Sequence, residues 1–351
     1  MNRIGLLVTG LILSWGTHTL LACCAVSSPG RVVVNADQTV LMIWNAKTET
    51  QHFIRQASFK SDANDVGFLV PSPSKPELAE TDQAVFDTLK LITAPPNTTY
   101  GLGGGGGNFG GGAARSPKPV EIIEQKRVAG FDATVLKADS GESLVEWLKN
   151  NQYDYSPAVA AWAKPYIKDK WFFTALKVVP KEEAAKKQNG DLQSPGLRIS
   201  FKTEQPLFPY REPKSAPQAK NLTAKTRTLQ IFFIAEGQYA GALNKPESWS
   251  GRTVWSNKLG AEDVKTLVAQ LKLPAEQFPA EPWLTEFQDK WAYDRAQSDL
   301  RFVAIASIPA RKTEAIPVAP STAPRLQKQI EDQGREEVRK ALERLNKQPK
   351  P

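Results

Sequence analysis

The chain has 351 residues, of which 41% are hydrophobic and 9% aromatic, and this excludes a disordered protein while leaving room for one large or two ordinary domains. The net charge is +8, but Lys and Arg are scattered and are densest only near the C-terminus, which gives no support to a nucleic-acid partner. The only histidines are His18 and His52, so we expect no histidine metal site and no cofactor.

The first 22 residues have the layout of a secretory signal peptide. Arg3 supplies a positive start, residues 4–13 form an apolar core, and a small residue, Ala22, precedes Cys23. The apolar core is too short to span a membrane, and we expect no transmembrane helix in the mature chain. The sequence therefore predicts an exported protein, periplasmic, associated with the outer membrane, or extracellular.

Cys23 has three interpretations. Residues 20–23 (Leu-Leu-Ala-Cys) resemble the bacterial lipobox, in which the cysteine receives a lipid, although Leu21 is larger than usual at its position. Ordinary cleavage after Ala22 is the second interpretation. A disulfide between Cys23 and Cys24 is the third, because the chain has no other cysteine. Lipidation at Cys23 would tether the protein to a membrane.

The mature chain begins with a predicted antiparallel β-meander over residues 31–70. It has strands near 32–34, 39–44, 51–59 and 66–70, with a turn at 35–38, and a helix follows at 80–92. His52 falls on the polar side of a strand without a visible partner, which favours a structural role. The Gly-rich insert at 101–119 lacks the strand and helix that a phosphate-binding loop needs, and we interpret it as a flexible loop.

Residues 128–179 predict a strand, two helices and a strand. Asp139 is the expected N-cap of the first helix, answered by Glu142, and Pro157 begins the second. Together with the meander, this kernel predicts an α+β fold of mixed sheets with helices packed on them. Strands are also predicted at 197–201, 228–235 and 251–255, a helix at 261–271, a further helix within 282–293, and a last core strand at 301–308.

The predicted globular region covers residues 23–308, as one large domain or two intimately packed ones. A Pro/Ala linker follows at 309–324, and residues 325–351 form a charged helical tail. The tail carries an apolar seam, interrupted by Gly334, that can pack on the body, pack on another chain, or remain solvated. The seam consists of Leu326, Ile330, Val338, Leu342 and Leu345.

The sequence contains no recognisable catalytic motif. The carboxylates to inspect are Asp62, Asp65 and Glu77 near a proline-rich loop, where solvated turns are the better explanation. Four tryptophans in irregular or short segments are candidates for stacking on a sugar or a peptide, with core or loop-anchoring roles as the alternative. These four are Trp249, Trp255, Trp283 and Trp291.

Three blocks, in this order along the chain, resemble the exported bacterial proteins grouped as domain of unknown function 2330. They consist of residues 35–45, 52–55 and 67–73; of 147–153, 166–167 and 173–177; and of 197–201, 206 and 209–211. The resemblance implies an exported protein over roughly residues 23–307. It implies no catalytic residue, because the family carries no established activity. The Gly-rich insert and the charged tail depart from the family pattern.

Together these observations predict an exported bacterial envelope protein that is a non-catalytic binding or structural module. Its expected partner is an envelope polymer or another envelope protein, with a membrane tether through a lipid on Cys23. The alternative is an envelope hydrolase that cleaves glycan or peptide with a pair of carboxylates about 5 to 10 Å apart.

Overall fold

The computed structural model describes residues 25–27, 33–61, 66–95, 120–151, 153, 157–178, 191–193, 196–211, 213, 226–244, 248–292 and 298–312. The predicted signal peptide at 1–22, Cys23, Cys24, the Gly-rich insert, most of the predicted linker and the predicted charged tail lie outside these residues.

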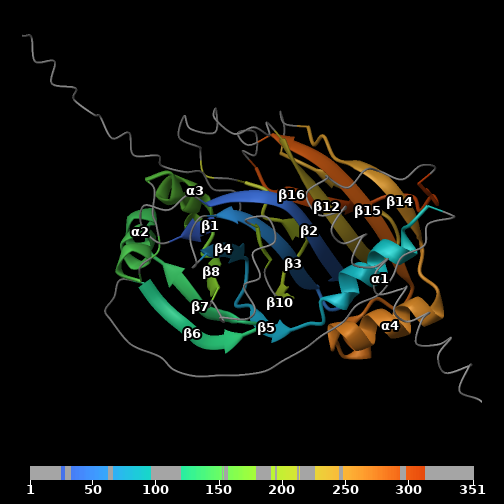
Figure 1. The fold of residues 1–351 in the computed structure, drawn as a ribbon, viewed down its shortest axis with the longest axis horizontal. Coiled ribbons are helices and arrows are strands. Elements are labelled where there is room, and N and C mark those ends of the chain that lie inside the picture. Colours follow the sequence, from blue (N-terminus) through green and yellow to red (C-terminus); the bar gives the residue numbers. More distant parts are fainter. Residues whose placement is uncertain are drawn as a thin grey trace, which may run out of the picture.

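The described chain forms three β-sheets and two helix pairs, as expected for an α+β fold. Helices α2 and α3 lie at one end of the molecule, and α1 and α4 lie at the other (Figure 1). The helices are α1 (Ala84–Ile92), α2 (Gly141–Asn150), α3 (Pro157–Lys168) and α4 (Ala261–Leu271), with a 3-10 turn at Ala275–Gln277.

The largest sheet, sheet B, has eight strands, and all its pairings are antiparallel except that of β12 with β2. Its main path runs through β14 (Arg252–Lys258), β15 (Pro282–Ala292), β12 (Thr226–Glu236), β2 (Val33–Asn45), β3 (Thr50–Ser61), β10 (Leu197–Lys202) and β5 (Glu77–Glu80), and β9 (Asp191–Gln193) pairs with β3.

Two smaller antiparallel sheets complete the fold. Sheet A runs through β1 (Ala25–Ser27), β4 (Val66–Ser72), β8 (Phe172–Val178), β7 (Phe131–Ala138) and β6 (Val120–Val128). Sheet C runs through β11 (Leu207–Phe208), β16 (Leu300–Ala304) and β13 (Tyr239–Ala242).

Three apolar cores hold these elements together. One joins sheet A to α2 and α3 through Leu136, Leu148 and Phe173, and another joins sheet B to α1 and α4 through Ile234 and Leu267. The third core lies between the sheets, and its buried members include no helical residue. Strands of sheets A and B are therefore covered on both faces, which explains their nearly continuous apolar runs.

The predicted meander is wrong in its pairing. Strands β2 and β3 are neighbours in sheet B, but β4 leaves them and pairs with β1 and β8 in sheet A. The turn expected at 35–38 is an irregularity inside β2, where the register shifts between Asn35 and Gln38. A local bulge of this kind lets the strand continue.

The strand predicted to begin at residue 128 begins instead at Phe131, as β7, after a hairpin turn from β6. Ala129 and Gly130 both have positive φ, at 51° and 77°, and form the two-residue turn. Strand β6 was not predicted. The N-cap of α2 is Ser140 rather than Asp139: its side chain accepts from the Ser143 amide, and Ser143 answers in place of Glu142.

Two C-terminal predictions are also wrong. Residues predicted to hold a helix within 282–293 form strand β15, which is buried on both faces. The predicted last core strand at 301–308 is shorter, since β16 ends at Ala304 and only Leu300 and Phe302 in it are buried.

Candidate functional site

Residues 206–211, which we call the central loop, are held by a buried side chain from β3. The Gln51 amide donates to the Leu207 carbonyl oxygen at 2.8 Å, and the Leu207 N–H donates to Gln51 Oε1 at 2.8 Å. Gln51 is fully buried, and these two bonds give its side-chain nitrogen and its side-chain oxygen one partner each without water. The central loop is thereby fixed against the middle of sheet B.

Tyr210 of the central loop belongs to a cluster around a buried carboxylate. Asp289 on β15 is 1% exposed and accepts three hydrogen bonds. Tyr210 Oη donates to Oδ2 at 2.7 Å, Trp249 Nε1 donates to Oδ2 at 3.0 Å, and Ser250 Oγ donates to Oδ1 at 2.6 Å. Donors on both oxygens offset the loss of hydration that burial imposes on this carboxylate.

The indole of Trp249 is wedged rather than free. It packs on Phe287 and Phe302, with ring centroids 5.4 and 6.3 Å away. Gly241 and Gly251 lie against the ring so closely that a Cβ at either position would overlap it. This ring therefore anchors the loop before β14 and is not presented as a stacking platform.

A second carboxylate, Asp299, connects the central loop to α3. Tyr166 Oη donates to Asp299 Oδ1 at 2.7 Å, and the Arg211 N–H donates to the same oxygen at 3.2 Å. Trp162 Nε1 in turn donates to the Arg211 carbonyl oxygen at 3.0 Å. Burial raises the pKa of Asp299 above its usual value, although the Tyr166 hydrogen bond and the Arg211 charge act in the opposite direction.

His52 is fully buried, although the sequence placed it on a polar strand face. Its Nδ1 lies 2.8 Å from Ser200 Oγ on the neighbouring strand β10. Burial, followed by the nearby Arg198 charge, lowers the pKa of His52 to about 4. The imidazole is therefore neutral near pH 7.

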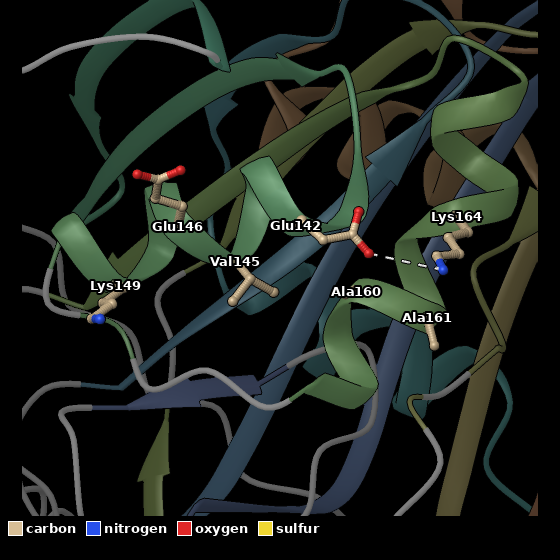
Figure 2. Close-up of a pocket in the computed structure, with 7 residues that line it drawn as sticks. All are labelled: Glu142, Val145, Glu146, Lys149, Ala160, Ala161 and Lys164. Carbon is tan, nitrogen blue, oxygen red and sulfur yellow. Dashed lines mark ion pairs between the residues drawn. The ribbon is translucent and has the colours of Figure 1, made fainter.

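An open groove lies between α2 and α3 and has a volume of about 560 Å³. Figure 2 shows it lined by exposed side chains of α2 and by the facing turn of α3. Glu142 points toward Lys164, with 3.9 Å between Oε1 and Nζ, whereas Glu146 points away from this pair. The lining residues are Glu142, Val145, Glu146, Lys149, Ala160, Ala161 and Lys164.

The other predicted stacking residues occupy different places. Trp255 is buried in the core beneath α4, and Trp283 is half-buried, with its Nε1 donating to Ser256 Oγ at 2.6 Å. Trp291 lies in β15, but its side chain is outside the described part, as is Cys23. The structure brings Trp255 and Trp283 onto one strand pair, β14 and β15, and places Trp249 beside it.

Of the three carboxylates singled out near the proline-rich loop, the structure describes one. Glu77 is exposed at the start of β5, and Asp62 and Asp65 fall outside the described residues. Within the described residues, no group of three or more His, Cys, Asp or Glu side chains could hold a metal ion. The helices described here include none that is both long and apolar enough to cross a membrane.

Sequence reasoning missed Asp289, Asp299 and Gln51. A signal for Asp289 existed: if residues 282–292 are taken as a strand, Asp289 falls on the same face as Phe287 and is predicted to be a buried carboxylate. The motif at 209–211, quoted for the family resemblance, supplies Tyr210 and Arg211 to the two clusters.

Comparison with known proteins confirms the family. The model of the family described as "Uncharacterized protein conserved in bacteria", domain of unknown function 2330, matches residues 18–302, and the chain belongs to this family. No curated protein matches the chain. Among solved structures, it is similar to the crystal structure of baculovirus P35, at 8% identity over 81% of this chain and 98% of that one. The TM-score of this match is 0.34.

Proposed function

We propose that this protein is an exported component of the bacterial cell envelope that acts as a non-catalytic binding or structural module. The observation that carries the proposal is the Asp289 cluster. The carboxylate of Asp289 is 1% exposed and accepts hydrogen bonds from Tyr210, Trp249 and Ser250. Three of its roughly four acceptor positions are used to hold loops together, which leaves little capacity for a substrate.

Export and tethering rest on the first 23 residues, with their signal-peptide layout and lipobox-like end at Cys23. The test is the intact mass and detergent partitioning of the protein produced in a bacterial host, compared with Cys23→Ser. We expect a lipid-sized mass increase in the wild type that the variant loses. A wild-type chain recovered from the cytoplasm with residues 1–22 still attached would contradict export itself.

The binding role is supported by the groove between α2 and α3 and by the basic charge of the chain. Val145, Ala160 and Ala161 offer an apolar floor, and charged groups of both signs surround it. With a net charge of +8, an anionic envelope polymer is the partner that electrostatics favours. Co-sedimentation with purified envelope polymer should weaken as salt increases. Failure to sediment at low salt would contradict this partner.

The second candidate function is a carboxylate hydrolase, and one observation favours it. Glu142 and Glu146 are one helical turn apart in the same groove, where neighbouring side chains have Cβ atoms about 5 to 6 Å apart. Figure 2 shows these two carboxylates pointing in different directions, which is why we prefer the binding role. Turnover of glycan or peptide by the wild type that is lost in both Glu142→Gln and Glu146→Gln would establish the hydrolase.

A further inference from the structure

In the last described residues, polar groups bond inward to the protein while aliphatic side chains are exposed to solvent. Residues 305–312, which we call the strap, follow β16 and direct polar groups inward. The Ile305 N–H donates to the Gln238 carbonyl oxygen at 2.9 Å, and the Ile308 N–H donates to Gln238 Oε1 at 2.8 Å. Meanwhile the side chains of Val303, Ile305 and Ile308 are 43%, 46% and 67% exposed. These three side chains lie close together along the chain, and exposed aliphatic side chains that form one contiguous patch mark contact surfaces.

The far end of the strap is clamped, so these aliphatic side chains cannot simply turn inward. Ala310 and Ser256 exchange two backbone hydrogen bonds, of 2.6 and 2.7 Å, at the outer edge of β14. Beyond them, Lys312 Nζ lies 2.7 Å from Glu286 Oε2, and the two side chains are 12% and 1% exposed. Among the described residues, the Gln230 amide is the other donor to this buried carboxylate, so removal of the cation, and with it release of the strap, is unfavourable.

The strap extends the outer face of sheet C, which differs from the other two sheets in its cover. Sheets A and B each have one face packed against a helix pair. The inward side chains of sheet C, among them Phe208, Tyr239 and Phe302, belong to the core between the sheets. On the other face, Leu207 at the β11 edge is already buried beside Gln51, whereas Val303 lies opposite Ala240 and is 43% exposed. Neither helix-bearing core includes a buried residue of sheet C. A sheet face that carries aliphatic side chains is normally covered by another layer.

We propose that Val303, Ile305 and Ile308 form a docking surface for residues 325–346 of the same chain. This segment lies outside the described residues and carries the apolar seam of Leu326, Ile330, Val338, Leu342 and Leu345. Its members lie three or four residues apart except across Gly334, where Ile330 and Val338 are eight residues apart, and this spacing keeps them on one side of a helix. Docking would supply sheet C with the cover that α2/α3 and α1/α4 give to the other sheets.

The length of the connection favours this occupant over a second copy. About a dozen residues separate Lys312 from Arg325, enough to span roughly 40 Å when extended, and a 22-residue helix is roughly 33 Å long. A tethered segment has an effective concentration on the order of millimolar, far above that of a separate chain in dilute solution. The clamp at Lys312 fixes the point from which the connection starts.

Hydrogen exchange of the full chain tests the proposal. Amides of residues 325–346 should exchange at least about tenfold more slowly than in a free peptide of the same sequence, because helix formation and docking protect them. In Ile308→Asp this protection should fall about tenfold, since a buried aliphatic side chain is replaced by a charge. Ile122→Asp is the matched control, because Ile122 is also exposed, at 39%, but lies on the edge strand β6, and it should leave the protection unchanged.

The reciprocal variant is Leu342→Asp, which should speed exchange within residues 303–308. Three results would overturn the proposal. The first is free-peptide exchange of residues 325–346 in the wild type. The second is protection that survives Ile308→Asp, which would place the segment elsewhere. The third is protection that appears only with increasing concentration and with a dimeric mass, which would make a second copy the occupant.

Discussion

Two carboxylate-bearing regions of this molecule have opposite designs. Asp289 is 1% exposed and is held by donors from three separate side chains, whereas Glu142 and Glu146 lie on the open surface of α2, with one lysine at 3.9 Å from Glu142. In the first region, hydrogen bonds from the protein replace the hydration that the buried carboxylate has lost. In the second region, the carboxylates are exposed and remain hydrated by solvent.

This difference in burial indicates which substitutions should alter stability and which should alter binding. The donors to Asp289 come from residues 40 and 79 positions away in the sequence, so this carboxylate links distant segments. The groove residues come from two consecutive helices and bind few internal partners. Substitutions should therefore act on folding at Asp289 and on binding at the groove.

The largest expected effect is that of Asp289→Ala. Removal of the carboxylate leaves the Tyr210, Trp249 and Ser250 donors without their acceptor and should lower the free energy of unfolding by about 4 kcal/mol. Denaturant unfolding followed by fluorescence measures this. Glu146→Ala is the matched control, with an expected change within about 0.5 kcal/mol. Equal effects of the two substitutions would break the comparison.

The second effect concerns the buried ion pair of the strap. Lys312→Met leaves Glu286 buried without its cation and should lower the free energy of unfolding by about 3 kcal/mol. Lys258→Met provides the control, because Lys258 pairs with Glu281 at 3.0 Å on the surface, where such pairs contribute less than about 1 kcal/mol. Chemical denaturation of both variants gives the comparison, and a silent Lys312→Met would contradict the clamp.

The third effect depends on pH and comes from His52. Its pKa is about 4 in the folded protein, below the unfolded value of about 6.5, so the unfolded chain binds the proton first as pH falls. Stability from this group is present above pH 6.5 and is lost as pH falls toward 4, by at most about 3 kcal/mol. Unfolding at several pH values should show this slope, reduced in His52→Gln. An unchanged slope in the variant would assign the pH dependence to other groups.

The smallest effect is expected at the groove. Lys164→Met removes the exposed partner of Glu142 and should change the free energy of unfolding by less than about 0.5 kcal/mol. If the groove binds an anionic polymer, the same substitution should weaken co-sedimentation. A large loss of stability would show that the Glu142–Lys164 pair stabilises the fold, as the Asp289 cluster does.

Local elements were predictable from the sequence where one pattern dominated. The helix at 261–271 was predicted with the bounds that α4 has, because its apolar stripe and acidic first turn agree. Strand β15 was mistaken for a helix, since burial on both faces removes the alternation that identifies a strand and leaves aromatic residues four apart, such as Trp283 and Phe287.

Long-range relations were not predictable. Nothing in residues 66–72 says that β4 pairs with β8 about a hundred residues later rather than with β3 next to it. The Asp289 cluster depends on that kind of pairing, because its members meet only after sheets B and C have packed together. Tyr210 and Arg211 were noticed as part of a family motif, but their roles as a donor to Asp289 and a donor to Asp299 required the fold.

The most direct test of the account is a double-mutant cycle on Tyr210 and Asp289. Unfolding free energies of the wild type, Tyr210→Phe, Asp289→Asn and the double variant give the coupling between the two side chains. If the buried carboxylate serves the fold, the coupling should be about 1 to 3 kcal/mol, with both single variants clearly destabilised. Additivity within about 0.5 kcal/mol, with an Asp289→Asn variant as stable as the wild type, would contradict the structural role and return Asp289 to the candidates for chemistry.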